Sequence, residues 1–158
     1  MKEYTEVKVR FLRERGVVMT IQRTAVLEAL DDIGEIHPTA EDIYNYLRER
    51  YPTISLATIY NTLDMFHRFG LVQELSLPRQ ERRYDPNIKP HPHFFCRVCG
   101  RVWDLSGICP IPDCPVLRME TLDGNRVEGV QICFYGVCEG CLGKAKTKEE
   151  GWERKAKR

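Results

Sequence analysis

The 158-residue sequence lacks the features that mark several large classes of protein. It has no apolar run long enough to cross a bilayer, and its charged N-terminus lacks the apolar core of a signal segment. It also lacks a charge excess, because 24 Lys and Arg face 23 Asp and Glu. We therefore expect a cytoplasmic protein with no membrane partner, whose binding to nucleic acid would require a local basic patch.

Histidine is scarce in the chain, whereas cysteine is not, with 4 histidines against 7 cysteines. In a reducing compartment, cysteines indicate metal ligands or free thiols rather than a disulfide framework. Two Cys-x-x-Cys pairs are formed by Cys96, Cys99, Cys138 and Cys141. Paired thiolates suit a tetrahedral structural zinc, which we prefer to the alternatives of unrelated reduced pairs or a redox dithiol.

The histidines directly before the first cysteine pair indicate a second metal site. His91 and His93 cannot join a zinc shell that four thiolates already fill. Imidazoles combined with carboxylate oxygens bind harder divalent metals. A structural metal beside a separate, open metal site is the arrangement of a metal sensor.

Apolar periodicity predicts helices in the first half of the chain and mainly short strands in the second. The helical pattern places Val7, Ile21 and Tyr46 on apolar faces. Residues 71–77 and 81–85 follow as a predicted hairpin. Helices followed by a two-stranded ribbon outline a winged helix-turn-helix, a DNA-binding fold.

A turn-rich stretch predicts the boundary between two domains. We assign residues 1–85 to the winged-helix DNA-binding domain, 86–90 to a hinge, 91–145 to a small zinc-binding α/β domain, and 146–158 to a charged tail. The second domain is expected to hold strands at 93–95, 102–105 and 127–135, with a short helix that ends at 116–121. The predicted fold class is therefore α+β.

Residues 55–63 would form the DNA-reading helix of such a fold. Its exposed N-terminal face offers Ser55, Ala57, Thr58, Tyr60 and Asn61. Asparagine pairs with adenine, threonine and alanine touch thymine methyl groups, and tyrosine reaches phosphate. Arg23 is a candidate phosphate contact. Periodicity alone favours a plain solvated helix face, so the DNA-binding interpretation needs support from the rest of the chain.

Taken together, these segments resemble the ferric uptake regulator (Fur) family, and within it the peroxide-sensing PerR branch. The motifs that carry the resemblance lie at residues 19–23, 37–44, 56–63, 91–100 and 135–141. Asn61 stands where the Fur branch usually has arginine and the PerR branch asparagine. The resemblance implies a metal-dependent transcriptional repressor, not an enzyme, with a C-terminal dimerisation domain. Its implied partners are an operator in double-stranded DNA and a second copy of the chain, with no small organic substrate.

The resemblance also implies the ligands of two metals. Cys96, Cys99, Cys138 and Cys141 match the family's structural zinc ligands. The regulatory ligands of the family match His37, Asp85, His91, His93 and Asp104. The implied regulatory metal is Fe(II) or Mn(II), with Zn(II) possible in vitro. By the same resemblance, aspartate at position 85 accompanies peroxide sensing, in which bound Fe(II) reacts with peroxide and His37 or His91 is oxidised, while Mn(II) gives a peroxide-insensitive form.

Other interpretations stay open at the level of sequence. An iron- or zinc-uptake regulator of the same family is the first alternative, although zinc sensors tend to place a cysteine where this chain has Asp85. A metallohydrolase is the distant one, and it would need a general base and a substrate cleft. The stretch 129–133 contains no histidine, so a third metal site is not expected. Cys109, Cys114 and Cys133 are interpreted as ordinary thiols, and His67 as a surface residue.

Overall fold

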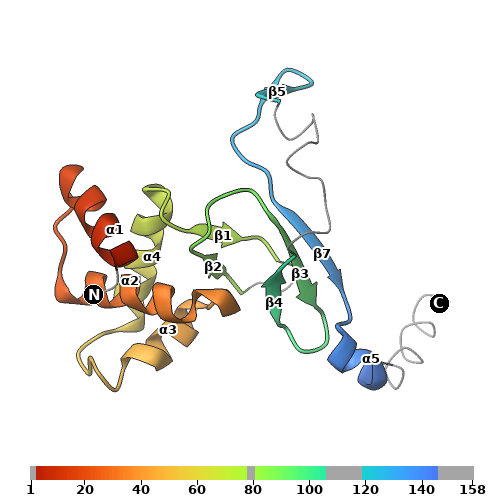
Figure 1. Ribbon diagram of the computed structural model, residues 1–158, viewed down its shortest axis with the longest axis horizontal. Coiled ribbons are helices and arrows are strands. Elements are labelled where there is room, and N and C mark those ends of the chain that lie inside the picture. Colours follow the sequence, from red (N-terminus) through yellow and green to blue (C-terminus); the bar gives the residue numbers. More distant parts are fainter. Residues whose placement is uncertain (1–2, 78–80, 106–118, 146–158) are drawn as a thin grey trace. The chain divides into compact units, whose positions relative to one another are not determined.

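The computed structural model describes residues 3–77, 81–105 and 119–145 (Figure 1). The chain divides into two compact units, Met1–Lys89 and Pro90–Arg158, called here the first and the second unit. The boundary between the two units falls within residues 86–90, the predicted hinge. Cys109, Cys114 and the whole of the predicted tail lie outside the described residues.

Helices make up most of the first unit. They are α1 (Glu3–Glu14), α2 (Ile21–Ile33), the short 3-10 helix η1 (Gly34–Ile36), α3 (Ala40–Leu47) and α4 (Leu56–Arg68). Hydroxyl side chains of Thr20, Thr39 and Ser55 begin α2, α3 and α4 by accepting hydrogen bonds from backbone N–H groups of the first turn. Helix α4 ends before Gly70, whose positive φ of 66° closes the last turn without a Cβ clash.

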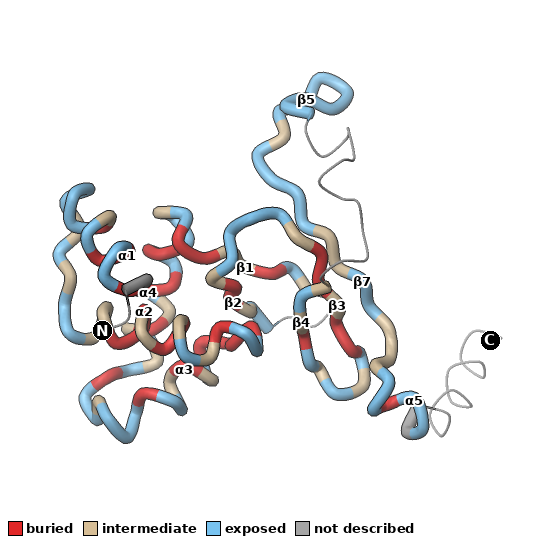
Figure 2. The backbone as a smooth tube through the Cα atoms, in the orientation of Figure 1, coloured by how far each residue is buried: buried red, intermediate tan, exposed pale blue. Residues whose placement is uncertain are grey.

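The helices enclose one apolar core, visible as the buried stripes of α2, α3 and α4 in Figure 2. Its fully buried side chains include Leu12, Leu27, Leu30, Ile43, Ile59, Leu63, Phe66 and Tyr84. Tyr84 belongs to the predicted hairpin, which consists of β1 (Gln73–Leu75) and β2 (Arg83–Asp85) in antiparallel register. Burial of Tyr84 therefore fastens the ribbon to the helices and completes the winged helix.

Three residues that periodicity places on apolar faces are largely exposed instead. Val7 is 52% exposed and Ile21 77%, and Tyr46, also exposed, donates its hydroxyl to Asp32. In α1 the inward position next to Val7 is taken by Lys8, which is 6% exposed. Lys8 can lie inward because its charge has a buried partner in the neighbouring helix.

That partner is Asp31 of α2. The Lys8 ammonium lies 3.9 Å from the Asp31 carboxylate, which also accepts a hydrogen bond from the Thr5 hydroxyl. Burial lowers the pKa of Lys8 to about 8, although the charges of Asp31 and Asp85 act to raise it. The contact therefore holds α1 against α2 through a desolvated ion pair.

The second unit contains a sheet with the strand order β4-β3-β7. These strands are β3 (Pro92–Cys96), β4 (Val102–Asp104) and β7 (Ile132–Gly136); β3 pairs antiparallel with β4 and parallel with β7. A small hairpin of β5 (Thr121–Leu122) and β6 (Asn125–Arg126) precedes β7. Helix α5 (Glu139–Ala145) follows β7.

Two expectations for the second unit are wrong. Residues 119–121 are not helical, because they lead into the tight β5–β6 hairpin, where Asp123 and Gly124 both adopt positive φ. The strand expected at 127–135 begins only at Ile132. Helix α5 was not anticipated, since Gly140 and Gly143 interrupt its apolar pattern. Among the described residues, no helix combines the length and the apolar character needed to cross a bilayer.

Replacing Asp31 by leucine should lower the free energy of unfolding by about 3 kcal/mol, because Lys8 would stay buried without this partner. Urea unfolding followed by circular dichroism measures the change. The double replacement Lys8→Met with Asp31→Leu removes both charges and should recover most of the loss. Equal stability of Asp31→Leu and the wild type would show that the ion pair does not hold α1.

Candidate metal centres and DNA-reading helix

Four cysteine sulfurs converge in the second unit. The Sγ atoms of Cys96, Cys99, Cys138 and Cys141 all lie within 4.8 Å of one another. Parallel pairing of β3 with β7 places Cys96 beside Gly136, two residues before Cys138. The two Cys-x-x-Cys turns, called here the knuckles, are therefore brought together by the sheet.

Backbone hydrogen bonds shape both knuckles. Gly100 donates its N–H to the carbonyl of Cys96 at 2.8 Å and adopts a positive φ of 73°, which tightens the first turn. In the second knuckle the Cys141 N–H donates to the Cys138 carbonyl at 2.8 Å. The Cys138 N–H donates to the Cys96 sulfur at 3.3 Å, so the knuckles also bind each other.

The sulfur geometry fits zinc. The Sγ atoms of Cys99 and Cys138 lie 3.9 Å apart, and a tetrahedral ion with Zn–S bonds of about 2.3 Å separates its sulfurs by about 3.8 Å. Burial acts to raise the pKa of Cys96, but backbone N–H groups of the knuckles outweigh it and lower the pKa to about 6. The hydrogen bond with Cys138, together with burial, raises the pKa of Cys141 to about 12. A bound cation would favour the thiolate form of Cys141 that its surroundings otherwise oppose.

Two histidines and a carboxylate also converge in the second unit. The Nε2 atoms of His91 and His93 lie 3.0 Å and 3.5 Å from the same oxygen, Oδ1 of Asp104. The two imidazole rings have centroids 4.3 Å apart. Antiparallel register sets His93 directly opposite Asp104. Imidazole nitrogens and carboxylate oxygens are the donors that harder divalent metals prefer.

The first unit buries one histidine and one carboxylate close together. His37 follows η1 with a positive φ of 51°, and Asp85 ends β2; both are buried, and their donor atoms lie within 4.8 Å of each other. Asp85 accepts hydrogen bonds from the side chain of Gln73 and the backbone N–H of Asn87, both at 2.7 Å. Gln73 was not identified from the sequence, since only the β1–β2 register reveals that it faces Asp85.

The candidate DNA-reading residues lie on α4 or at its start. Ser55 caps the helix, and its Oγ lies 2.8 Å from the Thr58 hydroxyl. Ala57 and Asn61 are exposed, while Tyr60 is partly buried and donates its hydroxyl to Glu41 of α3 at 2.8 Å. Asn61 and Arg23 line the same hollow, together with Asp64, Met65, His67, Arg68, Glu74 and Arg82.

The remaining polar residues of interest have local partners. Arg82 pairs with Glu74 of β1 at 3.4 Å and with Asp64 of α4 at 3.8 Å, so one ion pair joins the β1–β2 hairpin to α4. His67 is exposed and contacts the Val72 carbonyl at 3.2 Å. Cys133 is partly buried on β7, and burial raises the pKa of its thiol. Within the described part of the chain, Cys133 is not among the grouped metal donors.

A model of the ferric uptake regulator family matches residues 14–108. The chain belongs to this family. The "Peroxide operon regulator" of Bacillus subtilis (strain 168) is 38% identical over 133 residues, which cover 84% of this chain and 90% of that protein. The "Peroxide-responsive repressor PerR" of Staphylococcus epidermidis is 36% identical over 146 residues, covering 92% and 91%.

Solved structures of the family share the fold. The Helicobacter pylori ferric uptake regulator superposes with a TM-score of 0.69 at 20% identity, covering 89% of this chain and 97% of that one. The peroxide-sensing PerR from Streptococcus pyogenes gives 0.50 at 28% identity, covering 87% and 92%. The predicted family, its PerR-like character and the α+β fold are confirmed. Members of the family are DNA-binding, dimeric transcription regulators, so the expectation of a regulator rather than an enzyme is confirmed as well.

Replacing Cys96 or Cys138 by serine should remove zinc and unfold the second unit. Structural zinc contributes about 10–16 kcal/mol in small metal-dependent domains, which matches the whole stability of an ordinary domain. Metal analysis and thermal unfolding measure both effects. Cys133→Ser is the matched control, because Cys133 lies outside the four-sulfur cluster, and it should keep its zinc. A stable, zinc-free Cys96→Ser dimer that still binds DNA would contradict the structural role.

Proposed function

We propose that the chain is a cytoplasmic, homodimeric repressor that binds an operator in double-stranded DNA and senses peroxide through regulatory Fe(II), with Mn(II) as a peroxide-insensitive substitute. The proposal is supported most by the donor set, which within each unit consists of imidazole nitrogens and aspartate oxygens. The chain's similarity to named peroxide regulators over most of its length also supports the proposal.

The proposed regulatory ligands are His37 and Asp85 of the first unit with His91, His93 and Asp104 of the second. Three imidazoles and two carboxylates suit Fe(II), Mn(II) or Zn(II) in five- or six-coordinate geometry. Gln73 and the backbone of Asn87 hold the Asp85 carboxylate in place for such a role. Four sulfurs of the knuckles would hold structural zinc, which has no redox chemistry and leaves sensing to the other site.

Ligands drawn from both units supply the coupling to DNA. Binding of one ion by both His37 and His91 would restrict the motion of the DNA-reading helix α4 relative to the second unit, which carries the dimer interface in this proposal. In a dimer, two such helices must reach successive major grooves, about 34 Å apart. Metal and operator would then favour the same arrangement, and each would strengthen the binding of the other.

Iron, when bound, supplies the electron-transfer chemistry through which peroxide oxidises a nearby side chain. His37 and His91 are the proposed targets. Oxidation of a ligand imidazole removes a donor, weakens metal binding, and so releases the operator. A metal-uptake regulator is the second candidate, favoured by the likeness to a "zinc-bound manganese uptake regulator" at 26% identity and a TM-score of 0.61. If the protein is such a regulator, removal of the regulatory metal should release the DNA, and no histidine should be oxidised.

The test uses an inverted-repeat DNA duplex selected in vitro with the Mn(II)-loaded wild type. His37→Ala and Asp85→Ala should abolish metal-dependent binding and keep both zinc and fold. After peroxide, the Fe(II) form should release the duplex and gain one oxygen atom on His37 or His91, read by peptide mass spectrometry; the Mn(II) form should stay bound. Release that tracks oxidation of Cys96 or Cys138, with both histidines unmodified, would replace the iron-centred mechanism by a thiol switch.

Asn61→Ala should weaken binding to the selected duplex by about 10- to 100-fold and leave binding to random DNA nearly unchanged, since a good base contact is worth about 1–3 kcal/mol. Arg23→Ala should weaken both and reduce the slope of log affinity against log salt by about 1. Fluorescence anisotropy at several salt concentrations distinguishes a base contact from a phosphate contact. Equal losses on both DNAs for Asn61→Ala would refute base reading by this residue.

A further inference from the structure

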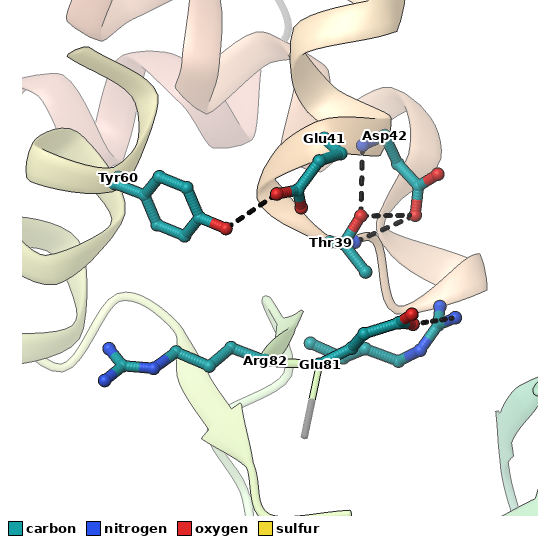
Figure 3. Close-up of a pocket in the computed structure, with 7 residues that line it drawn as sticks. Thr39, Glu41, Asp42, Tyr60, Glu81 and Arg82 are labelled. Carbon is teal, nitrogen blue, oxygen red and sulfur yellow. Dashed lines mark hydrogen bonds and ion pairs between the residues drawn. The ribbon is translucent and has the colours of Figure 1, made fainter. Parts of the chain in front are cut away.

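A carboxylate of one helix holds a candidate DNA-reading side chain of another. The Tyr60 hydroxyl of α4 donates to Glu41 Oε1 of α3 at 2.8 Å (Figure 3). This hydrogen bond, followed by burial and by the negative charge of Glu41, raises the pKa of Tyr60. The hydrogen bond therefore directs the Tyr60 hydroxyl toward Glu41, and the position of Glu41 sets its orientation.

Glu41 occupies the first turn of α3, which begins with a complete capping box. Thr39 Oγ1 accepts from the Asp42 N–H at 3.1 Å, and Asp42 Oδ2 accepts from the Thr39 N–H at 2.9 Å. Both bonds lie beside the Tyr60–Glu41 contact in Figure 3. The backbone that carries Glu41 is thus fixed on both sides of the residue.

The same segment is tied to β2. The Tyr84 N–H donates to the Pro38 carbonyl at 3.0 Å, and the Arg83 guanidinium donates to the His37 carbonyl at 3.0 Å. Thr39 also forms an isolated β-bridge with Arg83. His37 and Asp85, which flank these contacts along the chain, are both buried. A displacement of His37 or of β2 must therefore move the start of α3, and Glu41 with it.

We propose that Glu41 is a positioning residue that couples the backbone around His37 to the orientation of Tyr60 on the DNA-reading helix. This inference rests on the proposed function, since it takes His37 as a metal ligand and Tyr60 as a DNA contact. The path is short: Glu41 follows His37 by four positions, and one hydrogen bond then joins Glu41 to α4. The carboxylate acts as an acceptor of fixed position, and its charge serves to strengthen that bond.

The decisive variants are Glu41→Ala, Glu41→Gln, Tyr60→Phe and the double variant Glu41→Ala with Tyr60→Phe. Glu49→Ala is the matched control, since it removes one exposed carboxylate just beyond α3. Two quantities are measured on the full-length protein. The first is the ratio of dissociation constants for the selected duplex without and with Mn(II), with Mn(II) affinity determined separately. The second is the pKa of Tyr60 in metal-free protein by ¹³C NMR, assigned by the signal missing from Tyr60→Phe.

Glu41→Ala should reduce the Mn(II)-dependent ratio by about fivefold or more, the scale of a typical coupling between sites, and should return the Tyr60 pKa toward its ordinary value. Mn(II) affinity in the absence of DNA should change far less. Glu41→Gln should keep most of the ratio because its amide oxygen still accepts the hydrogen bond. The double variant should lose no more than Tyr60→Phe alone, since both remove the same contact.

Three results would overturn the inference: a wild-type ratio in Glu41→Ala, additive losses in the double variant, or equal losses in Glu41→Gln and Glu41→Ala. The last would assign the effect to the charge of Glu41 rather than to its hydrogen bond with Tyr60, and Glu49→Ala measures the effect of removing one carboxylate elsewhere. Failure of the proposed function is a separate outcome, because the wild type itself would then show no dependence of DNA binding on Mn(II).

Discussion

Backbone pairing of β3 with β4 and β7 is the constraint on which the second unit depends. Within the range Pro92–Cys96, β3 sets His93 opposite Asp104 and Cys96 beside Gly136. One short strand therefore positions donors for both kinds of metal site. Because the two cysteine pairs come from distant parts of the chain, their geometry rests on this hydrogen-bonded ladder and on the positive φ of Gly100 that turns the first knuckle.

The first unit depends in a similar way on the contact of β2 with the start of α3. Burial of Tyr84 anchors the strand in the helical core, and its neighbours Arg83 and Asp85 reach the segment after η1 and the side chain of Gln73. A candidate metal donor and the turn that carries Glu41 thus share one scaffold. Under the proposed coupling, a small change at the buried His37 would reach the exposed face of α4 through this scaffold.

Much of the fold could be anticipated from the chain alone, and the failures have physical causes. Capping residues such as Thr39 and Ser55 mark helix starts. Their hydroxyls accept hydrogen bonds from backbone N–H groups of the first turn, which have no partner within the helix. The burial of Lys8 in α1 could not be anticipated, because it depends on a partner 23 positions away, Asp31. The length of β7 was overestimated, since the apolar Val127 and Val130 give no sign of where pairing with β3 stops.

The sequence by itself determined the family, the four cysteines of the zinc cluster and the candidate donors, because metal chemistry restricts which residue types serve and motif spacing is a local property of the chain. Tertiary structure alone decided how these residues are supported. The contacts of Gln73 with Asp85 and of Glu41 with Tyr60 join residues 12 and 19 positions apart. Such pairs arise from strand register and helix packing, and no local pattern encodes which side chains the fold will bring within hydrogen-bonding distance.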